Sequence, residues 1–211
     1  MISPITLLSC EEIILNIIAK KLDIKVKIDP GYLVFDRKSN RYIALSYILN
    51  LNNGKCPFLK DNKCLLHDIY KPLICRAFPY IPREVKYLYN DSLKILIAKV
   101  NYGLSMKCPV INNDQEYLNT LFNLSPSLIA KYMPDEYLSA LEMERKRSII
   151  LSLLSSLWQQ DIVDLVPNKN NINNNYNRVL NVYELLRKYY PNLPYRLGIY
   201  KTLHVLRKLA P

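Results

Sequence analysis

The sequence predicts an α+β protein with a small antiparallel sheet region that holds a four-cysteine metal site, followed by a C-terminal helical bundle. Short β-rich runs broken by turns fill residues 24–100, whereas apolar residues recur at helical spacing after residue 113. Four of the five cysteines lie within one 53-residue span, and they are Cys56, Cys64, Cys75 and Cys108. We therefore expect a cysteine-cluster metal-binding domain over residues 1–112 and a helical region over residues 113–211.

The N-terminal part is expected to begin with a helix. Ser9 and Glu12 have the spacing of a capping box, and an apolar helical pattern follows to about Lys21. Period-two alternation and β-rich composition then predict strands, which are placed at 24–28, 32–35 and 41–49 and, as a second hairpin, at 85–89 and 93–100.

The C-terminal part reads as amphipathic helices. They are expected at about 114–123, 134–166, 176–189 and 195–208, with Pro134 at a first-turn position. A polar, asparagine-rich loop is expected at 167–175.

Charge and glycine content narrow the function classes. The formal net charge is +11, and residues 1–112 hold 17 Lys and Arg against 9 Asp and Glu. This excess indicates either a polyanion partner such as nucleic acid or compensation of negative thiolates. The four glycines are isolated, so neither a P-loop nor a dinucleotide-binding glycine turn is present.

The start of the chain and its most apolar stretch predict no membrane association. No signal-peptide pattern is present, and residues 13–19 are too few to cross a bilayer. We therefore expect a cytoplasmic protein, in which clustered cysteines indicate metal binding. The alternative is a disulfide-stabilised protein without metal, because the Ile-, Tyr- and Lys-rich composition suits a thermophile, and hyperthermophiles keep intracellular disulfides.

The cysteine spacing favours a [4Fe–4S] cluster over the alternative, zinc (Zn). Four thiolates satisfy either centre, but the C-x7-C-x10-C-x32-C spacing lacks the close pair typical of zinc knuckles. Prolines directly follow Cys56 and Cys108, as one does after a ligand in bacterial ferredoxins. Four protein ligands leave no open metal position, so the expected role is structural, redox or regulatory.

The charged and metal-ligating residues near the four cysteines are given expected roles from their side-chain chemistry. Lys71 and Arg76 are expected to meet the negative charge of the cofactor, and Arg76 and Arg83 are alternative contacts for an anionic substrate. His67 is the replacement ligand if one cysteine is not used, and is otherwise a surface residue or a support to the site. Cys10 is expected in the core.

The segments Cys56-Pro57-Phe58-Leu59, Cys64 and Lys71-Pro72-Leu73-Ile74-Cys75-Arg76-Ala77-Phe78-Pro79-Tyr80 resemble the YkgJ-type cysteine-cluster family. The resemblance covers about residues 5–110 and implies a zinc- or iron-chelating domain. Distant relatives include flagellin lysine N-methylases, reported as iron–sulfur proteins, so a methylase-like transferase is an alternative function. The opening C-x2-C-x2-C-C cluster of the family is missing here, which weakens that alternative.

Partner binding gives a further alternative. The basic face and the C-terminal helices are expected to serve as a scaffold for a protein partner or for nucleic acid, although no nucleic-acid-binding motif is present. Tyr70, Tyr80, Tyr87 and Tyr89 are either a stacking platform for bases or residues of the core and its rim.

Overall fold

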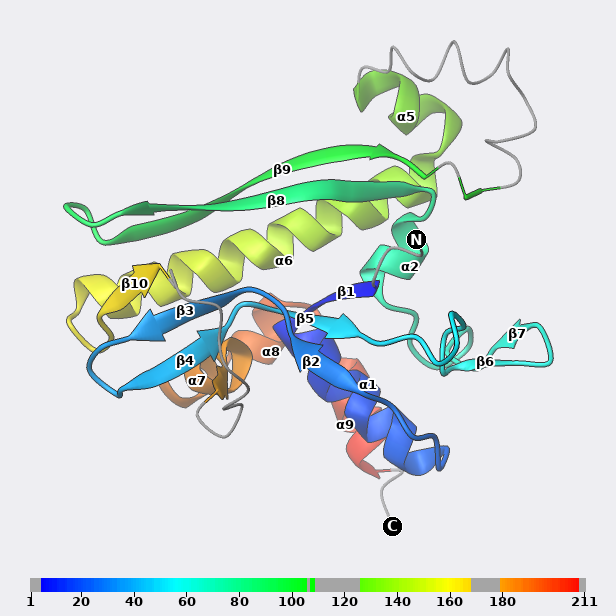
Figure 1. Ribbon diagram of the computed structural model, residues 1–211, viewed down its shortest axis with the longest axis horizontal. Coiled ribbons are helices and arrows are strands. Elements are labelled where there is room, and N and C mark those ends of the chain that lie inside the picture. Colours follow the sequence, from blue (N-terminus) through cyan, green and yellow to red (C-terminus); the bar gives the residue numbers. More distant parts are fainter. Residues whose placement is uncertain (1–4, 106, 109–125, 168–178, 209–211) are drawn as a thin grey trace.

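The structure is a computed structural model that describes residues 5–105, 107–108, 126–167 and 179–208 (Figure 1). The first half begins with β1 (Ile5–Leu8), α1 (Ser9–Lys21), β2 (Ile28–Pro30), β3 (Leu33–Asp36), β4 (Arg41–Ala44) and β5 (Ser46–Leu49). It continues with β6 (Leu59–Lys60), β7 (Lys63–Cys64), α2 (Leu73–Ala77), β8 (Tyr80–Asn90) and β9 (Ile95–Leu104). The second half contains α5 (Pro126–Tyr132), α6 (Pro134–Gln159), β10 (Leu165–Pro167), β11 (Val179–Asn181), α7 (Val182–Tyr189), α8 (Leu193–Arg196) and α9 (Tyr200–Lys208).

The strands form two small sheets and two hairpins. One antiparallel sheet has the order β1-β5-β2, and a mixed sheet has the order β10-β3-β4-β11, in which β11 runs parallel to β4. The β6–β7 and β8–β9 pairs are separate antiparallel hairpins. The mixed sheet takes its two central strands from the first half of the chain and its two outer strands from the second half.

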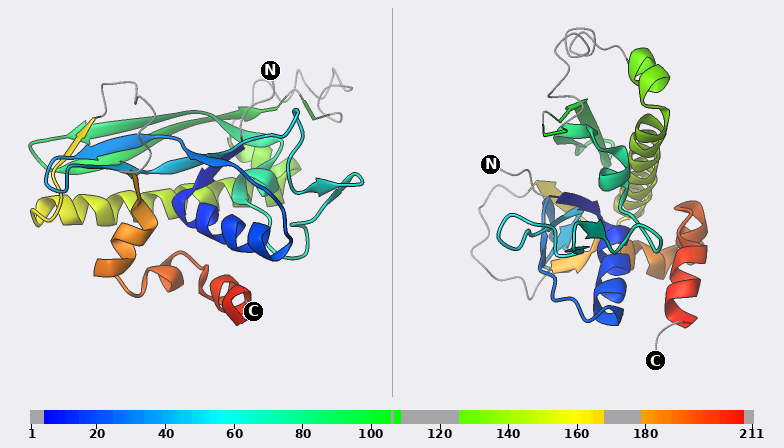
Figure 2. Two further views of the ribbon diagram at one scale, coloured as in Figure 1. Left: turned by 60° about the horizontal axis from the view of Figure 1, so that its bottom comes forward. Right: turned by 90° about the vertical axis from the view of Figure 1, so that its right-hand side faces the viewer.

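The predicted fold class is wrong in its C-terminal bundle. Helix α6 lies along the long β8–β9 hairpin and contacts α2 as well as α7, while α7 and α9 also contact α1 at the other end of the chain (Figures 1 and 2). The reason is that two short apolar runs, β10 and β11, pair with β3 and β4. This pairing interrupts the helical part of the chain with strands, so α6 packs on β9 and α2 as well as on α7, and α7 packs on β11 and α1. The fold class is also wrong in its four-cysteine site, which is not found among the described residues.

Helix α1 has the predicted bounds, but a different cap. Its N-cap is Leu8, whose N–H donates to the Glu11 carboxylate at 2.9 Å, so Glu11 and not Glu12 supplies the carboxylate half of a capping box, and the Leu8 side chain has no acceptor to supply the other half. Pro134 occupies the first position of α6, as predicted.

Several predicted boundaries are corrected. Helix α6 ends at Gln159 because the chain must turn back to pair as β10, and α7 starts only after β11. The predicted final helix is split into α8 and α9 at Gly198, whose φ of +64° breaks the helical path. In the first half, only residue 28 of the strand expected at 24–28 is in β2, and the run 41–49 is divided into β4 and β5. The ranges 114–123 and 168–175 lie outside the described residues.

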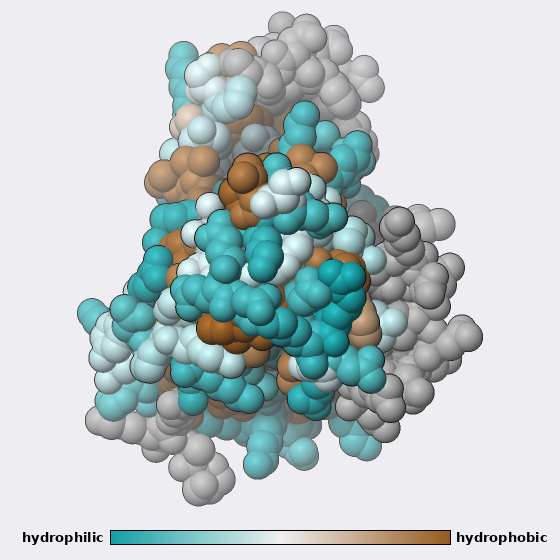
Figure 3. All heavy atoms as spheres, turned by 90° about the vertical axis from the view of Figure 1, so that its left-hand side faces the viewer, coloured by the Kyte–Doolittle hydropathy of each residue, from teal (hydrophilic) through white to brown (hydrophobic). Residues whose placement is uncertain are grey.

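The hydrophobic core is built mainly from α1, α6, α7 and the two sheets, with Leu15, Ile43, Leu154 and Leu186 fully buried. The end of the molecule that carries the β8–β9 turn is mostly hydrophilic (Figure 3). There Asp161 pairs with Lys38 and Lys94, and Arg37 pairs with Asp164 at 2.7 Å. Within the described ranges, none of the helices has the length and apolarity needed to cross a membrane.

Candidate thiol site

Three of the predicted ligands come from one continuous stretch, residues 56–75. The N–H of Leu59 donates to the Cys56 carbonyl at 3.0 Å, and Leu59 is paired directly across the β6–β7 hairpin with Cys64. The His67 N–H donates to the Cys64 carbonyl at 3.1 Å and turns the chain again. Cys75 then follows in α2. The chain thus turns back twice, and these turns bring the three cysteines into the same region.

The surroundings of two of these thiols raise their pKa values. Burial is the main cause that raises the pKa of Cys75 to about 12, with smaller contributions from Cys56, Glu11 and Cys64 and an opposing one from Lys71. Burial also raises the pKa of Cys56; the Phe58 N–H, which bonds its sulfur, opposes this, and Cys64 adds to it. The free thiols of Cys56 and Cys75 are therefore protonated and poorly nucleophilic at neutral pH, whereas a bound metal would displace their protons.

The four-cysteine site predicted as part of the fold is not found. Among the residues that the structure describes, no three His, Cys, Asp or Glu side chains are grouped closely enough to hold a metal ion. Cys64 is exposed on a two-residue strand of a hairpin that projects from the body (Figure 1). Cys108 is on a separate turn after β9, where its N–H donates to the Ser105 carbonyl at 3.1 Å. All five cysteines are free thiols, so none of them forms a disulfide.

The predicted cofactor contacts face different surroundings. Lys71 is close enough to Cys75 to oppose the rise in the pKa of that thiol. Arg76 is directed to α6, where its guanidinium lies 3.8 Å from the Glu142 carboxylate. His67 is exposed. Cys10 is fully buried in the core, as predicted, and burial raises the pKa of its thiol to about 12.

The predicted tyrosine platform is internal. Tyr87 stacks on Tyr32 with a ring separation of 4.1 Å, and Tyr80 stacks on Tyr102 at 4.9 Å. The Tyr102 hydroxyl donates to Glu144 at 2.6 Å, and Glu144 is also paired with the buried Arg147. These rings fill the space between the long hairpin, α6 and the sheets, which agrees with the core alternative.

Glu11, the residue that fixes the helix carrying Cys75, was not among the predicted site residues. This carboxylate is fully buried and accepts hydrogen bonds from the Leu73 N–H at 2.7 Å and from the Tyr70 hydroxyl at 3.2 Å, besides its bond to Leu8. Burial raises the pKa of Glu11, and Lys146 opposes this. A glutamate inside an apolar helical pattern was the available signal, but its partners lie about 60 residues away.

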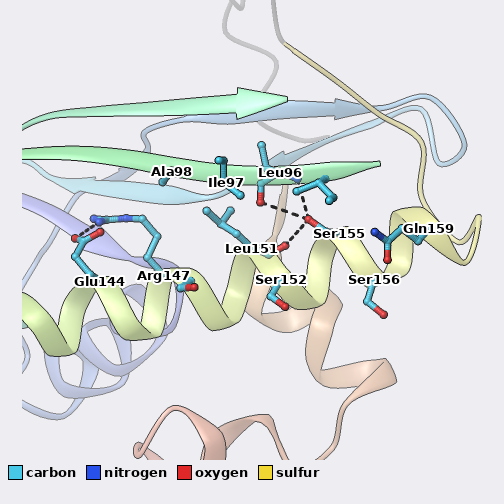
Figure 4. Close-up of a pocket in the computed structure, with 12 residues that line it drawn as sticks. Leu96, Ile97, Ala98, Glu144, Arg147, Leu151, Ser152, Ser155, Ser156 and Gln159 are labelled. Atoms are coloured by element: carbon cyan, nitrogen blue, oxygen red, sulfur yellow. Dashed lines mark hydrogen bonds and ion pairs between the residues drawn. The ribbon is translucent and has the colours of Figure 1, made fainter. Parts of the chain in front are cut away.

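A hollow of about 570 Å³ lies between β9 and α6 (Figure 4). Ser155 reaches across it, accepting from the Leu96 N–H at 2.9 Å and donating to the Leu151 carbonyl at 2.8 Å. The Glu144–Arg147 ion pair lies at its other end. Because the Ser155 hydroxyl is used to fasten strand to helix, we assign it no catalytic role.

Comparisons with known proteins give no relative for this chain. No protein-family model matches the sequence, and neither a curated protein nor a solved structure matches it. The resemblance to the YkgJ-type family therefore stays an expectation based on the residues around Cys56, Cys64 and Cys75.

Proposed function

We propose that the protein binds a metal centre through Cys56, Cys64 and Cys75, with an iron–sulfur cluster favoured over zinc. The observation that carries the proposal is that residues 56–75 turn back through the β6–β7 hairpin and carry Cys56, Cys64 and Cys75 on one continuous segment, although the structure does not group them into a formed metal site. The donor set fits a thiophilic centre, because thiolate is the ligand that iron–sulfur clusters and zinc share. When bound, the centre would supply a structural, redox or regulatory function.

The local packing supports a site that closes when metal binds. Phe58 and Leu66 are buried and anchor the base of the segment, whereas residues 59–64 at its tip are exposed. A segment with few buried contacts can be repositioned at small cost in free energy. Metal binding would then draw Cys64 toward Cys56 and Cys75, and Glu11 would hold Cys75 in place through the start of α2.

The test is elemental analysis and a visible spectrum of protein purified without air. We expect iron with inorganic sulfide and broad absorption near ~400 nm. C56S, C64S and C75S should each lose the metal, and C10A, which alters a buried core cysteine, should retain it. The metal content of C108S, compared with that of these variants, tells whether Cys108 is also a metal ligand. A colourless protein with stoichiometric zinc would replace iron–sulfur by zinc, and a metal content unchanged in C75S would refute the proposal.

The cytoplasm is the location we propose, because five free thiols suit a reducing compartment. We do not propose methyl transfer, since the sequence has neither a clustered-glycine cofactor turn nor the opening cysteine cluster of the related family.

A second candidate function is binding of single-stranded nucleic acid by α8 and α9. Tyr195 and Tyr200 stack with ring centroids 3.9 Å apart, and His204 continues the stack at 5.8 Å. Tyr195 is 61% exposed, so a base could stack on its outer face. Residues 182–208 hold six Lys and Arg against one Glu, and Arg145 of α6 adds a cation by donating to the Arg196 carbonyl.

Fluorescence anisotropy with a labelled single-stranded oligonucleotide tests this second function. We expect affinity to fall steeply with salt and Y195A to weaken binding about tenfold. Y132A, which removes a comparably exposed tyrosine from α5, is the matched control. Equal affinity of Y195A and the unchanged protein would exclude the stacked rings as the binding surface.

A further inference from the structure

A second pocket, of about 540 Å³, lies where β1, α2, β8 and the turn after β9 meet. This volume is within the range of pockets that hold small organic ligands. Cys75 lines it, so the pocket borders the candidate thiol site. Neither the metal proposal nor the nucleic-acid proposal uses this space.

The walls of the pocket are largely apolar. Ile5 comes from β1, Ile74 from α2, Phe78 from the residue after α2, and Ile81 from β8. Phe78 is 41% exposed, which is unusual for a phenylalanine beside a pocket and leaves part of its ring available for contact. A ligand with an apolar body would bury this surface and gain free energy from it.

Among the lining residues that the structure describes, two are cations and none is a carboxylate. The cations are Arg83 and Lys107. Arg83 is held in position, because its stem lies over Gly103, where an added Cβ would be 3.0 Å from the Arg83 Cγ, and its guanidinium donates to the Leu104 carbonyl. Arg83 takes part in none of the ion pairs found among the described residues. A positioned guanidinium beside an apolar wall selects for an anionic group.

We propose that this pocket binds a small amphipathic carboxylate. Its apolar body would lie against Ile74, Phe78 and Ile81, and its carboxylate would contact Arg83 and Lys107. The proposal goes beyond the metal centre and does not depend on it. If both hold, the ligand and the metal share Cys75 as a neighbour, so each would alter the binding of the other.

Titration calorimetry with decanoate tests the proposal, with decanamide as the neutral analogue. We expect saturable binding of decanoate to the unchanged protein and about tenfold weaker binding of decanamide, because the amide loses the charge-assisted hydrogen bonds. R83M should weaken decanoate binding by a similar factor while leaving the affinity for decanamide unchanged. K99M, which removes an exposed lysine from β9 outside the pocket, is the matched control.

The outcomes are separable from those of the metal proposal. The titrations are run on protein with and without chelator treatment, and metal content is measured on the same samples. Decanoate binding that survives in metal-free protein supports the pocket whether or not the metal proposal holds. Absence of decanoate binding, equal affinity for decanamide, or an R83M affinity equal to that of the unchanged protein would each overturn it. If R83M does not fold, K107M is used instead, and it should likewise weaken the binding of decanoate but not that of decanamide.

Discussion

The two hairpins of this protein differ in what holds them. The β8–β9 hairpin is packed along α6, with Leu96 buried beneath it, Ser155 bonded to its backbone and Gln159 donating to the Leu93 carbonyl. The β6–β7 hairpin has two residues in each strand, all of them exposed, and is anchored only at its base by Phe58 and Leu66. One hairpin is fixed by the body of the protein, whereas the other carries Cys64 on a tip with little tertiary support.

This difference indicates which of the two hairpins a bound ligand can order. A hairpin already packed on a helix gains little order from binding, whereas an exposed hairpin gains much. The turn of β6–β7 is nevertheless well formed, because Asp61 and Asn62 both have positive φ values, as a type I′ turn requires. We infer that the tip moves as a unit about the buried base.

The largest expected effect concerns the packed hairpin. L96A should cost about 2–5 kcal/mol in the free energy of unfolding, because it leaves a cavity between β9 and α6. The neighbouring residue Ile97 is 52% exposed, so I97A should stay within about 0.5 kcal/mol of the unchanged protein. Urea unfolding measures both. Equal losses would contradict the view that one face of this hairpin carries its packing.

The next effect concerns the base of the cysteine-bearing segment. E11Q should cost about 1–3 kcal/mol, because an amide accepts less strongly than a carboxylate from the Leu73 N–H and the Tyr70 hydroxyl. The pKa of Glu11 is raised from 4.5 in the folded protein, so the folded state holds this proton more tightly. Stability should therefore fall as pH rises from about 4.5 through the folded pKa.

Urea midpoints measured from pH 4 to pH 8 test the role of Glu11. The E11Q variant should lack the part of the pH dependence that Glu11 contributes, whereas E84Q, in which an exposed carboxyl of β8 is changed, should keep it. A profile that is identical for E11Q and the unchanged protein would show that the buried carboxyl does not titrate in this range.

Metal loading should produce a smaller, local effect that compares the hairpins directly. Amide hydrogen exchange at residues 59–64 should slow by the equivalent of about 1 kcal/mol or more, because ligation restrains the tip. Exchange along β8 and β9 should be unchanged. C75S serves as the control that binds no metal. Slowing that is equal in both hairpins would point to global stabilisation and against a tip that closes on the metal.

The smallest effect is expected at the exposed end of the long hairpin. Asp161 pairs with Lys38 and Lys94, and these cations lower its pKa below the usual 3.8, with Lys38 the larger cause. The stability from these pairs is present above pH 3.8 and is lost as pH falls through the lowered folded pKa. D161N should shift the thermal midpoint only slightly, and 0.5 M salt should reduce the shift further. D91N, which changes an aspartate of the β8–β9 turn, is the control. A D161N shift that persists in salt would contradict this account.

The sequence by itself determined the local elements whose causes are local. The bounds of α1, the first-turn position of Pro134 and the burial of Cys10 follow from apolar periodicity and from the fixed φ of proline, and the structure agrees with each. The α+β content was also predictable, since short β-rich runs and long helical patterns differ in period.

Only the tertiary structure decided which elements meet. Short apolar runs such as Leu165–Pro167 and Val179–Asn181 are extended because they pair with β3 and β4, whose residues lie more than 120 positions away, so no local pattern could separate them from the helices beside them. The same holds for the candidate site. Cysteine spacing predicted that four thiols gather at one point. Among the described residues they do not, because Glu11 fixes the helix that carries Cys75, Cys64 lies on an exposed hairpin and Cys108 lies on another turn, and these placements depend on contacts between distant segments.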